Sequence, residues 1–179
     1  SLSDLLSKGV TPKYYFLSGG GNKNTFTKIN LSKILKSLKE EQKKYSIKIG
    51  GGDTVYSKIP SFSVTVIGFS NKIIERNNAK INDDIYVTGN LGDSFLGLKI
   101  MQNKINVKGV QKKYFINKYY CPDLPFYFSK KLNSFANTSI DISDGLISDM
   151  ERLINNQNLS FKINLNNIPI SKNLDIFLN

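Results

Sequence analysis

Histidine is absent from this sequence of 179 residues, and cysteine is almost absent. Without histidine the chain cannot use Ser-His or Cys-His catalysis, and most zinc sites are excluded. The single cysteine, Cys121, rules out a disulfide within the chain and is compatible with a reducing cytosol. No apolar run approaches the roughly 20 residues that a membrane-spanning helix needs. We therefore expect a cytoplasmic protein with no membrane partner, whose function needs no histidine.

Arginine is also scarce, although the formal net charge is +11. Only Arg76 and Arg152 are arginines, and the other basic residues are lysines scattered along the chain. Specific recognition of phosphates and bases tends to use the planar fork of arginine. The lysines therefore indicate a solvated surface more than a nucleic-acid interface. A basic, non-enzymatic nucleic-acid-binding domain remains an alternative interpretation.

Carboxylates and hydroxyls gather in the stretch from Ser139 to Asp149. Alternating isoleucines predict the end of a strand around Asp141, and apolar residues at helical spacing predict a helix from residue 146 to residue 154. Ser143 or Asp144 can cap that helix, because their side chains accept hydrogen bonds from its free N–H groups. Asp141 lies too far upstream to be a cap. The second interpretation is a Mg²⁺ site, because Mg²⁺ prefers carboxylate oxygens together with water and phosphate.

Two glycine clusters follow expected strands. Residues 14–18 predict a strand, and the glycines of 19–22 predict a flexible turn, because they lack the spacing of a nucleotide-binding loop. Residues 46–49 predict a second strand that runs into Gly50-Gly51-Gly52-Asp53-Thr54. That cluster is either a turn at the end of the strand or a close backbone approach to a metal–phosphate complex, with Asp53 at the metal.

The remaining periodicity predicts alternating helices and strands. A helix over 30–42, capped by Asn30, places Leu31 and Leu35 on its apolar face. A polar stretch over 71–84 separates two units, 1–70 and 71–179. The fold class is therefore α/β to α+β. Further expected elements are a helix ending at Gly9, strands at 62–68, 85–87 and 161–165, and helices opening at Asp93 or Ser94 and over 110–119 and 125–135.

Three stretches in order resemble the thiamine-monophosphate kinase family, within the ATP-binding superfamily that also holds aminoimidazole ribonucleotide synthetase. They are Ser1-Leu2-Ser3-Asp4-Leu5, Gly51-Gly52-Asp53-Thr54 and Ile140-Asp141-Ile142-Ser143-Asp144-Gly145-Leu146. Gly9-Val10-Thr11-Pro12 and the run from Asp84 to Ser94 match the family as well. The resemblance extends from Ser1 to about Pro169, and the ordered set is more specific than any single motif.

The resemblance implies ATP-dependent phosphorylation of thiamine monophosphate to thiamine diphosphate by direct transfer, with Mg²⁺ held by aspartates. By position, Asp4, Asp53, Asp141 and Asp144 look like metal ligands. Gly52, Asp53, Arg76 and Ser143 look like nucleotide contacts, and no further catalytic residue is implied. Phosphoryl transfer suits a chain without histidine, because positioning and charge neutralisation carry most of this catalysis. The resemblance also implies a two-unit fold and a homodimer formed through the first unit.

Several family segments are missing. The family carries a Gly-Asp-Asp segment and a Thr-Asp segment upstream of the Asp4 position, and a Gly-Gly-Glu-Asp-Tyr segment downstream. We therefore expect an internal fragment truncated at both ends: the end of an N-terminal ATP-binding domain over 1–70, and the start of a C-terminal domain over 71–179. Such a fragment should be inactive alone, because it lacks about half of the metal ligands. Another ATP-using enzyme of the same superfamily is the remaining alternative.

Overall fold

The computed structural model describes residues 1–179, which divide into two compact units. Unit 1 comprises residues 1–80 and 126–158, and unit 2 comprises residues 81–125 and 159–179. No helix is both long enough and apolar enough to cross a membrane. The elements in chain order are α1 (Leu2–Ser7), β1 (Thr11–Gly21), α2 (Lys28–Tyr45), β2 (Lys48–Tyr56), β3 (Ser61–Phe69), α3 (Asp93–Met101), α4 (Gly109–Tyr120), α5 (Phe126–Leu132), α6 (Leu146–Leu153), the 3₁₀ helix η1 (Leu165–Asn167) and α7 (Lys172–Leu178).

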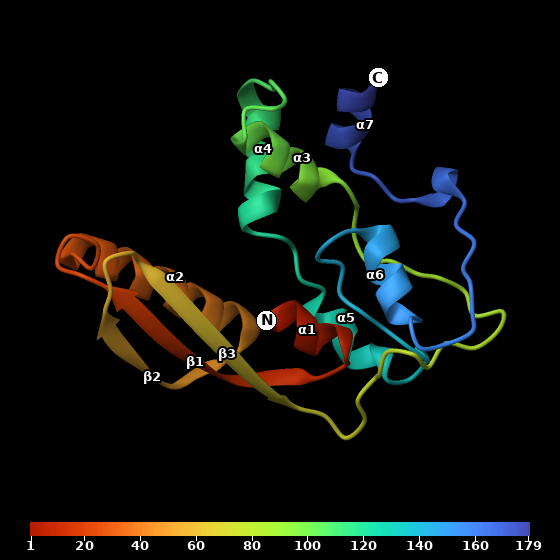
Figure 1. The fold of residues 1–179 in the computed structure, drawn as a ribbon, viewed down its shortest axis with the longest axis horizontal. Helices are drawn as coiled ribbons and strands as arrows, with labels where there is room; N and C mark the ends of the chain where they lie inside the picture. Colours follow the sequence, from red (N-terminus) through yellow and green to blue (C-terminus); the bar gives the residue numbers. More distant parts are fainter. The chain divides into compact units, whose positions relative to one another are not determined.

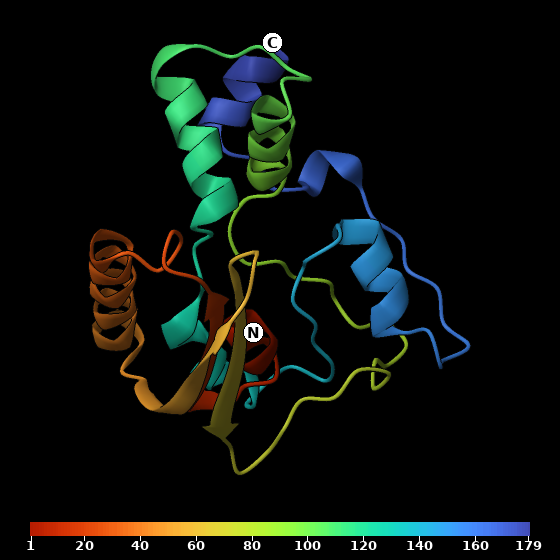
Figure 2. The same cartoon turned by 60° about the vertical axis from the view of Figure 1, so that its left-hand side comes forward.

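The three strands of unit 1 form one mixed sheet in the order β2-β1-β3. β1 pairs in parallel with β2 and antiparallel with β3. Parallel neighbours need a crossover connection, and α2 supplies it between β1 and β2. α2 lies along one face of this sheet (Figures 1 and 2). One small sheet therefore joins the three strands, and β1, the first strand in the sequence, lies at its centre.

Fewer apolar residues of α2 are buried than the sequence predicts. Tyr45 at its end is buried, and Gln42 donates a hydrogen bond to the Tyr15 hydroxyl on β1 (3.1 Å). Leu31 and Leu35, expected on the apolar face, are instead exposed by 40% and 57%. The predicted cap is also wrong: Thr27 is the N-cap, and its side chain accepts a hydrogen bond from the Asn30 N–H. The N-cap therefore lies three residues earlier than predicted.

The glycines of both clusters lie inside strands, so the turn predicted at 19–22 and the turn interpretation of 50–54 are wrong. Gly19 to Gly21 are the last residues of β1, and Gly50 to Thr54 lie in β2. The register of β2 against β1 shifts by one residue between Ile49 and Gly51, so Gly50 is the bulged residue. A Cβ on Gly52 would lie 1.9 Å from the Leu17 carbonyl oxygen. Close packing of the two strands thus requires glycine at position 52.

The turn after α1 is built as the sequence predicts. Gly9 has φ +68°, its N–H donates to the Leu6 carbonyl, and the Val10 N–H donates to the Leu5 carbonyl. This left-handed glycine ends the helix because a residue with a Cβ is strained there. A Cβ would also lie 2.2 Å from Oδ1 of Asn133.

Unit 2 is helical, and its core lies among α3, α4 and α7 (Figure 2). Asp93 is buried in the first turn of α3 and accepts hydrogen bonds from the Ser171 hydroxyl (2.6 Å) and the Tyr114 hydroxyl (2.8 Å). The expected cap of α3 is wrong, because the N-cap is Gly92 and no side chain caps this helix. Asp93 instead joins the three helices. The core residues are Leu96, Ile100, Val107, Phe115 and Leu174.

The other predicted helices form with boundaries that differ by a few residues: α4, α5 and α6 correspond to 110–119, 125–135 and 146–154. Three predicted strands do not form. The segments around Asp141, at 85–87 and at 161–165 contain no strand. Each alternates apolar and polar residues, but a strand also needs a hydrogen-bonded neighbour, and none of the three segments has one in this chain. The compact units divide at residues 80/81, 125/126 and 158/159.

Candidate functional site

The Asp141 carboxylate is joined to the start of α1, although 138 residues separate it from its partner. The Ser3 hydroxyl donates a hydrogen bond to Oδ2 of Asp141 (2.9 Å). Asp4 follows Ser3 in the first turn of α1. Two of the predicted metal ligands, Asp4 and Asp141, therefore lie on segments that are in direct contact.

The loop after Asp141 is held by a residue that we did not single out in the sequence. One carboxylate oxygen of Asp149, Oδ2, accepts the backbone N–H groups of Ser143 (2.8 Å), Asp144 (3.0 Å) and Gly145 (3.1 Å). Asp149 lies in the first turn of α6 and is 1% exposed. Burial acts to raise the pKa of this carboxyl, but the three N–H bonds and the nearby Arg152 outweigh it, and the pKa lies below its ordinary value.

Arg152 connects the loop to the helix. Its Nη1 contacts Oδ2 of Asp144 and donates to Oδ1 of Asp149 (3.1 Å). The hydrogen bond and the charge of Asp144 raise the pKa of the guanidinium above its ordinary value. The predicted capping of α6 by Ser143 or Asp144 is wrong: the N-cap is Gly145, which has no side chain to cap the helix. Asp144 is therefore occupied by an ion pair, and Asp149 binds the loop.

Arg76 lies on a segment that is held against the same part of unit 1. The Thr138 hydroxyl donates to the Glu75 carbonyl (2.8 Å), and the Asn77 N–H donates to the Leu153 carbonyl (2.7 Å). The backbone on both sides of Arg76 is thus fixed to the segment that leads into Asp141 and to the end of α6. Arg76 itself is exposed, and no recorded ion pair involves its side chain.

Asp53 is not joined to the other predicted ligands. It lies opposite Ser18 in the sheet, and its Oδ1 accepts the N–H of the adjacent Thr54 (2.7 Å). No group of three or more acidic, histidine or cysteine side chains lies close enough together to hold a metal ion. The structure brings Asp4 and Asp141 onto contacting segments, and places Ser143 and Asp144 on the loop that follows. It does not gather the four aspartates around one point.

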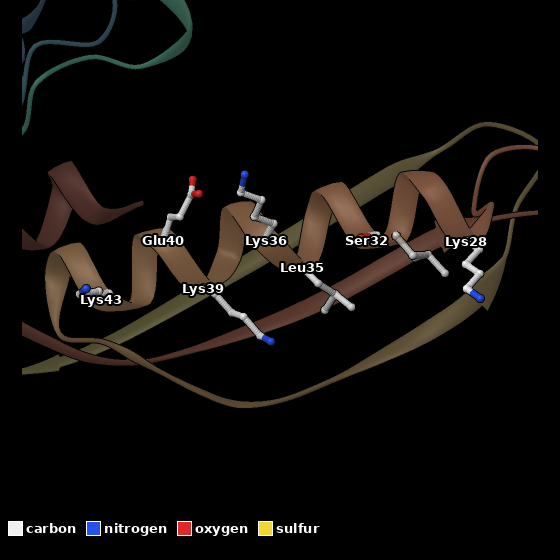
Figure 3. A pocket seen from close by; sticks show the side chains of 8 residues that line it. Lys28, Ser32, Leu35, Lys36, Lys39, Glu40 and Lys43 are labelled. Atoms are coloured by element: carbon white, nitrogen blue, oxygen red, sulfur yellow. The ribbon is translucent and has the colours of Figure 1, made fainter.

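A shallow, open hollow on the surface does not coincide with these residues. Its lining consists of eight side chains, all from α2, and Figure 3 shows them along one length of that helix. None of the predicted site residues lines it. It is the exposed outer side of α2, where lysines alternate with Leu31 and Leu35.

Sequence reasoning therefore found the acidic loop but missed its supports, which are Ser3, Asp149 and Arg152. One signal was available for Asp149: an aspartate one turn into a helix that follows Ser-Asp-Gly is placed to reach back to the loop. The site has carboxylates and hydroxyls on a loop that Asp149 holds by three hydrogen bonds. It also has Arg76, which forms no ion pair, and it has no histidine. Such groups can bind hard cations and phosphates.

The chain matches one family model and several curated proteins. Residues 1–70 match the family described as AIR synthase related protein, N-terminal domain. The chain is 38% identical over 175 residues to the thiamine-monophosphate kinase of Buchnera aphidicola subsp. Acyrthosiphon pisum, covering 96% of this chain and 53% of that protein. The chain thus spans about half the length of the curated relatives it matches.

Solved structures show the same fold. The crystal structure of thiamine monophosphate kinase from Aquifex aeolicus superposes with a TM-score of 0.91 at 24% identity, over 98% of this chain and 60% of that one. A structure of AaThiL complexed with AMPPCP and TMP gives a TM-score of 0.90 at 24% identity, over 98% of this chain and 56% of that one. At this identity the likeness establishes the fold, which this chain shares with both structures.

Proposed function

Because the chain is a homologue of thiamine-monophosphate kinases along nearly its whole length, we propose that its protein transfers a phosphoryl group from ATP to thiamine monophosphate, giving thiamine diphosphate. The observation that carries this proposal is the 38% identity over 175 residues, which include the acidic loop. The absence of histidine agrees with it, because phosphoryl transfer depends on positioning and charge neutralisation.

The donors in unit 1 fit Mg²⁺ by their chemistry. All are hard oxygen ligands, and Asp4 and Asp141 lie on segments in contact through Ser3. These two residues would hold the ion, with Asp53 and Asp144 as the further ligands that we propose. Asp144 would have to exchange its contact with Arg152 for the metal. When bound, Mg²⁺ would neutralise the negative charge of the phosphates.

The nucleotide contacts that we propose are Gly52, Asp53, Arg76 and Ser143. Gly52 offers backbone without a side chain on β2, and Arg76 offers a guanidinium with no recorded ion pair. An arginine that is not neutralised by a carboxylate is suited to bind a phosphate through two hydrogen bonds. Ser143 presents an exposed hydroxyl, since only its backbone N–H is engaged by Asp149.

Asp141→Asn tests the metal role, because it removes the charge and keeps an oxygen that can accept the Ser3 hydroxyl. In the protein as its gene encodes it, we expect kcat for Mg²⁺-dependent phosphorylation of thiamine monophosphate to fall by about 100-fold or more. The melting temperature should change little. Glu151→Gln removes an exposed carboxylate from α6 and serves as the matched control, with unchanged kcat. Wild-type kcat in Asp141→Asn would remove Asp141 from the site.

The acceptor is the part of this proposal that the site does not determine. Another ATP-using enzyme of the same superfamily could share the aspartates and act on a different acceptor. Assays with thiamine monophosphate and with unrelated acceptors separate the two. A homodimer formed through the sheet of unit 1 belongs to the same proposal, supported by the exposed apolar residues Tyr14, Phe16 and Ile67 on the strands. So do a cytoplasmic location and a boundary near residue 70 between an N-terminal ATP-binding domain and a C-terminal domain.

A further inference from the structure

Three successive backbone N–H groups in the acidic loop point at one oxygen atom. The N–H groups of Ser143, Asp144 and Gly145 all bond Oδ2 of Asp149, at 2.8, 3.0 and 3.1 Å. Consecutive N–H groups of this kind often form the concavity in which a phosphate binds. Here a carboxylate from the same chain fills that concavity. These three N–H groups are therefore not available to a phosphate.

Asp149 is suited to hold the loop and not to act at the metal itself. Oδ2 has three donors, Oδ1 accepts from Arg152 at 3.1 Å, and the residue is 1% exposed. Neither oxygen is open to solvent or to a bound ion. Arg152 also contacts the Asp144 carboxylate, so the clamp extends from the loop backbone to one of its side chains.

The bonded segment includes both Ser143 and Asp144, the residues whose side chains we assign to nucleotide and metal. Three hydrogen bonds to an ionised acceptor fix the orientation of successive peptide groups. The peptide groups in turn set the direction of the Cα–Cβ bonds of Ser143 and Asp144. The neighbouring Met150 is buried, so the part of α6 that carries Asp149 is anchored in unit 1. A loop held in this way reaches its binding geometry without being ordered by the ligand, which lowers the entropic cost of binding.

We propose that Asp149 is a positioning residue that holds Ser143 and Asp144 in the arrangement that binds Mg²⁺ and nucleotide. This inference rests on the proposed function. It assigns a role to a residue that touches neither the metal nor the substrate.

The test uses Asp149→Asn, with Glu151→Gln as the control from the same helix, in the protein as its gene encodes it. The first measurement is hydrogen exchange of the amides of residues 143–145, which does not depend on activity. The second is binding of Mg²⁺ and AMPPCP by calorimetry. The third is the kinase assay with thiamine monophosphate, in which KM for Mg·ATP and kcat are separated.

We expect Asp149→Asn to lose amide protection at 143–145, to bind AMPPCP about tenfold more weakly and to raise KM for Mg·ATP about tenfold, with a smaller change in kcat. Glu151→Gln should match the wild type in all three. Lost protection with unchanged nucleotide affinity would overturn the proposal. Amides at 143–145 that exchange in the wild type as fast as unprotected amides would overturn it as well. The second of these results remains available if Asp149→Asn does not fold.

The two proposals can fail separately. If the wild type binds AMPPCP but does not phosphorylate thiamine monophosphate, the proposed acceptor is wrong, and the affinity difference still tests Asp149. If the wild type binds neither Mg²⁺ nor AMPPCP, both proposals are wrong. If the wild type is an active kinase and Asp149→Asn has the same KM and affinity, only the positioning role is wrong.

Discussion

At the scale of single residues, the role of a carboxylate is determined more by the hydrogen-bond donors around it than by its position in the sequence. Asp141, Asp144 and Asp149 lie within nine residues of one another, yet each has a different environment. Asp141 accepts one hydroxyl, Asp144 contacts an exposed arginine, and Asp149 accepts three backbone N–H groups. The sequence marked the cluster. The division of roles within it depends on the path of the backbone, which a local pattern does not contain.

Asp149 should contribute to stability in a pH-dependent way. Its pKa in the folded chain lies below the value of about 3.9 for an unfolded aspartate, so its stabilising effect is complete above that value. The effect is lost as the pH falls through the folded pKa. Asp149→Asn should therefore lower the free energy of unfolding by about 2 kcal/mol at pH 7, because hydrogen bonds to a charged group are removed.

Urea unfolding of the wild type and Asp149→Asn at pH 7 and at pH 3 measures this effect. The difference between the two proteins should narrow at the lower pH, because below about pH 3.9 the unfolded wild-type chain binds a proton at this carboxyl and the folded chain binds it less readily. Glu151→Gln should show no such difference at either pH, because that side chain is exposed. An equal difference for Asp149→Asn at both pH values would contradict the ionised clamp.

At the scale of helices and strands, helices were predicted better than strands because their signal is local. The spacing of apolar residues and the turn at Gly9 were sufficient to predict α1, α3, α4 and α6. The cap of α2 was misassigned because Thr27 and Asn30 are both favoured capping residues. Strand pairing needs a distant partner. The glycines of β1 and β2 therefore read as turns, although they lie in the paired ladder.

Gly97 provides a test of the packing between α3 and α4. Its Cβ would lie 2.2 Å from the Phe115 carbonyl oxygen on α4, and backbone cannot easily move aside. In an open helix, glycine to alanine would stabilise by roughly 1 kcal/mol through helix propensity. The contact with α4 should reverse the sign, so that Gly97→Ala destabilises by about 1–3 kcal/mol. Thermal unfolding of unit 2, followed by circular dichroism, measures this change.

Met101→Ala is the comparison for Gly97→Ala, since Met101 is the last residue of α3 and is 37% exposed. Met101→Ala should cost less stability than Gly97→Ala, although Met101→Ala removes most of a side chain and Gly97→Ala adds only a methyl group. A stabilised Gly97→Ala protein would mean that α3 and α4 are not in close contact at this glycine.

At the scale of the whole molecule, the order of several weak motifs was more informative than any one of them. That order made Asp4 and Asp141 two of the four predicted metal ligands, and the Ser3–Asp141 hydrogen bond joins their segments. The division into compact units was less predictable. Unit 1 combines residues 1–80 with 126–158, so the chain leaves this unit and returns to it. Polar composition around residue 71 does not reveal such a return.

Residues 1–179 produced alone should show no kinase activity with thiamine monophosphate and Mg·ATP. The acidic side chains of this chain do not gather into a group able to hold a metal ion, and bare phosphates repel one another without a cation between them. A coupled assay for ADP measures the rate, with a full-length thiamine-monophosphate kinase such as that of Escherichia coli as the positive control. Turnover by the isolated chain at a rate comparable with that control would show that this prediction is wrong.

The strand order β2-β1-β3 leaves β3 with an outer edge that pairs with no other strand in this chain. Its sequence, Ser-Phe-Ser-Val-Thr-Val-Ile-Gly-Phe, contains neither a charge nor a proline, the two features that usually discourage strands of separate molecules from joining. It has the composition of segments that stack into cross-β fibrils. Preparations of the isolated chain will therefore be prone to precipitate through β3, and a lysine in place of Thr65 would interrupt that stacking.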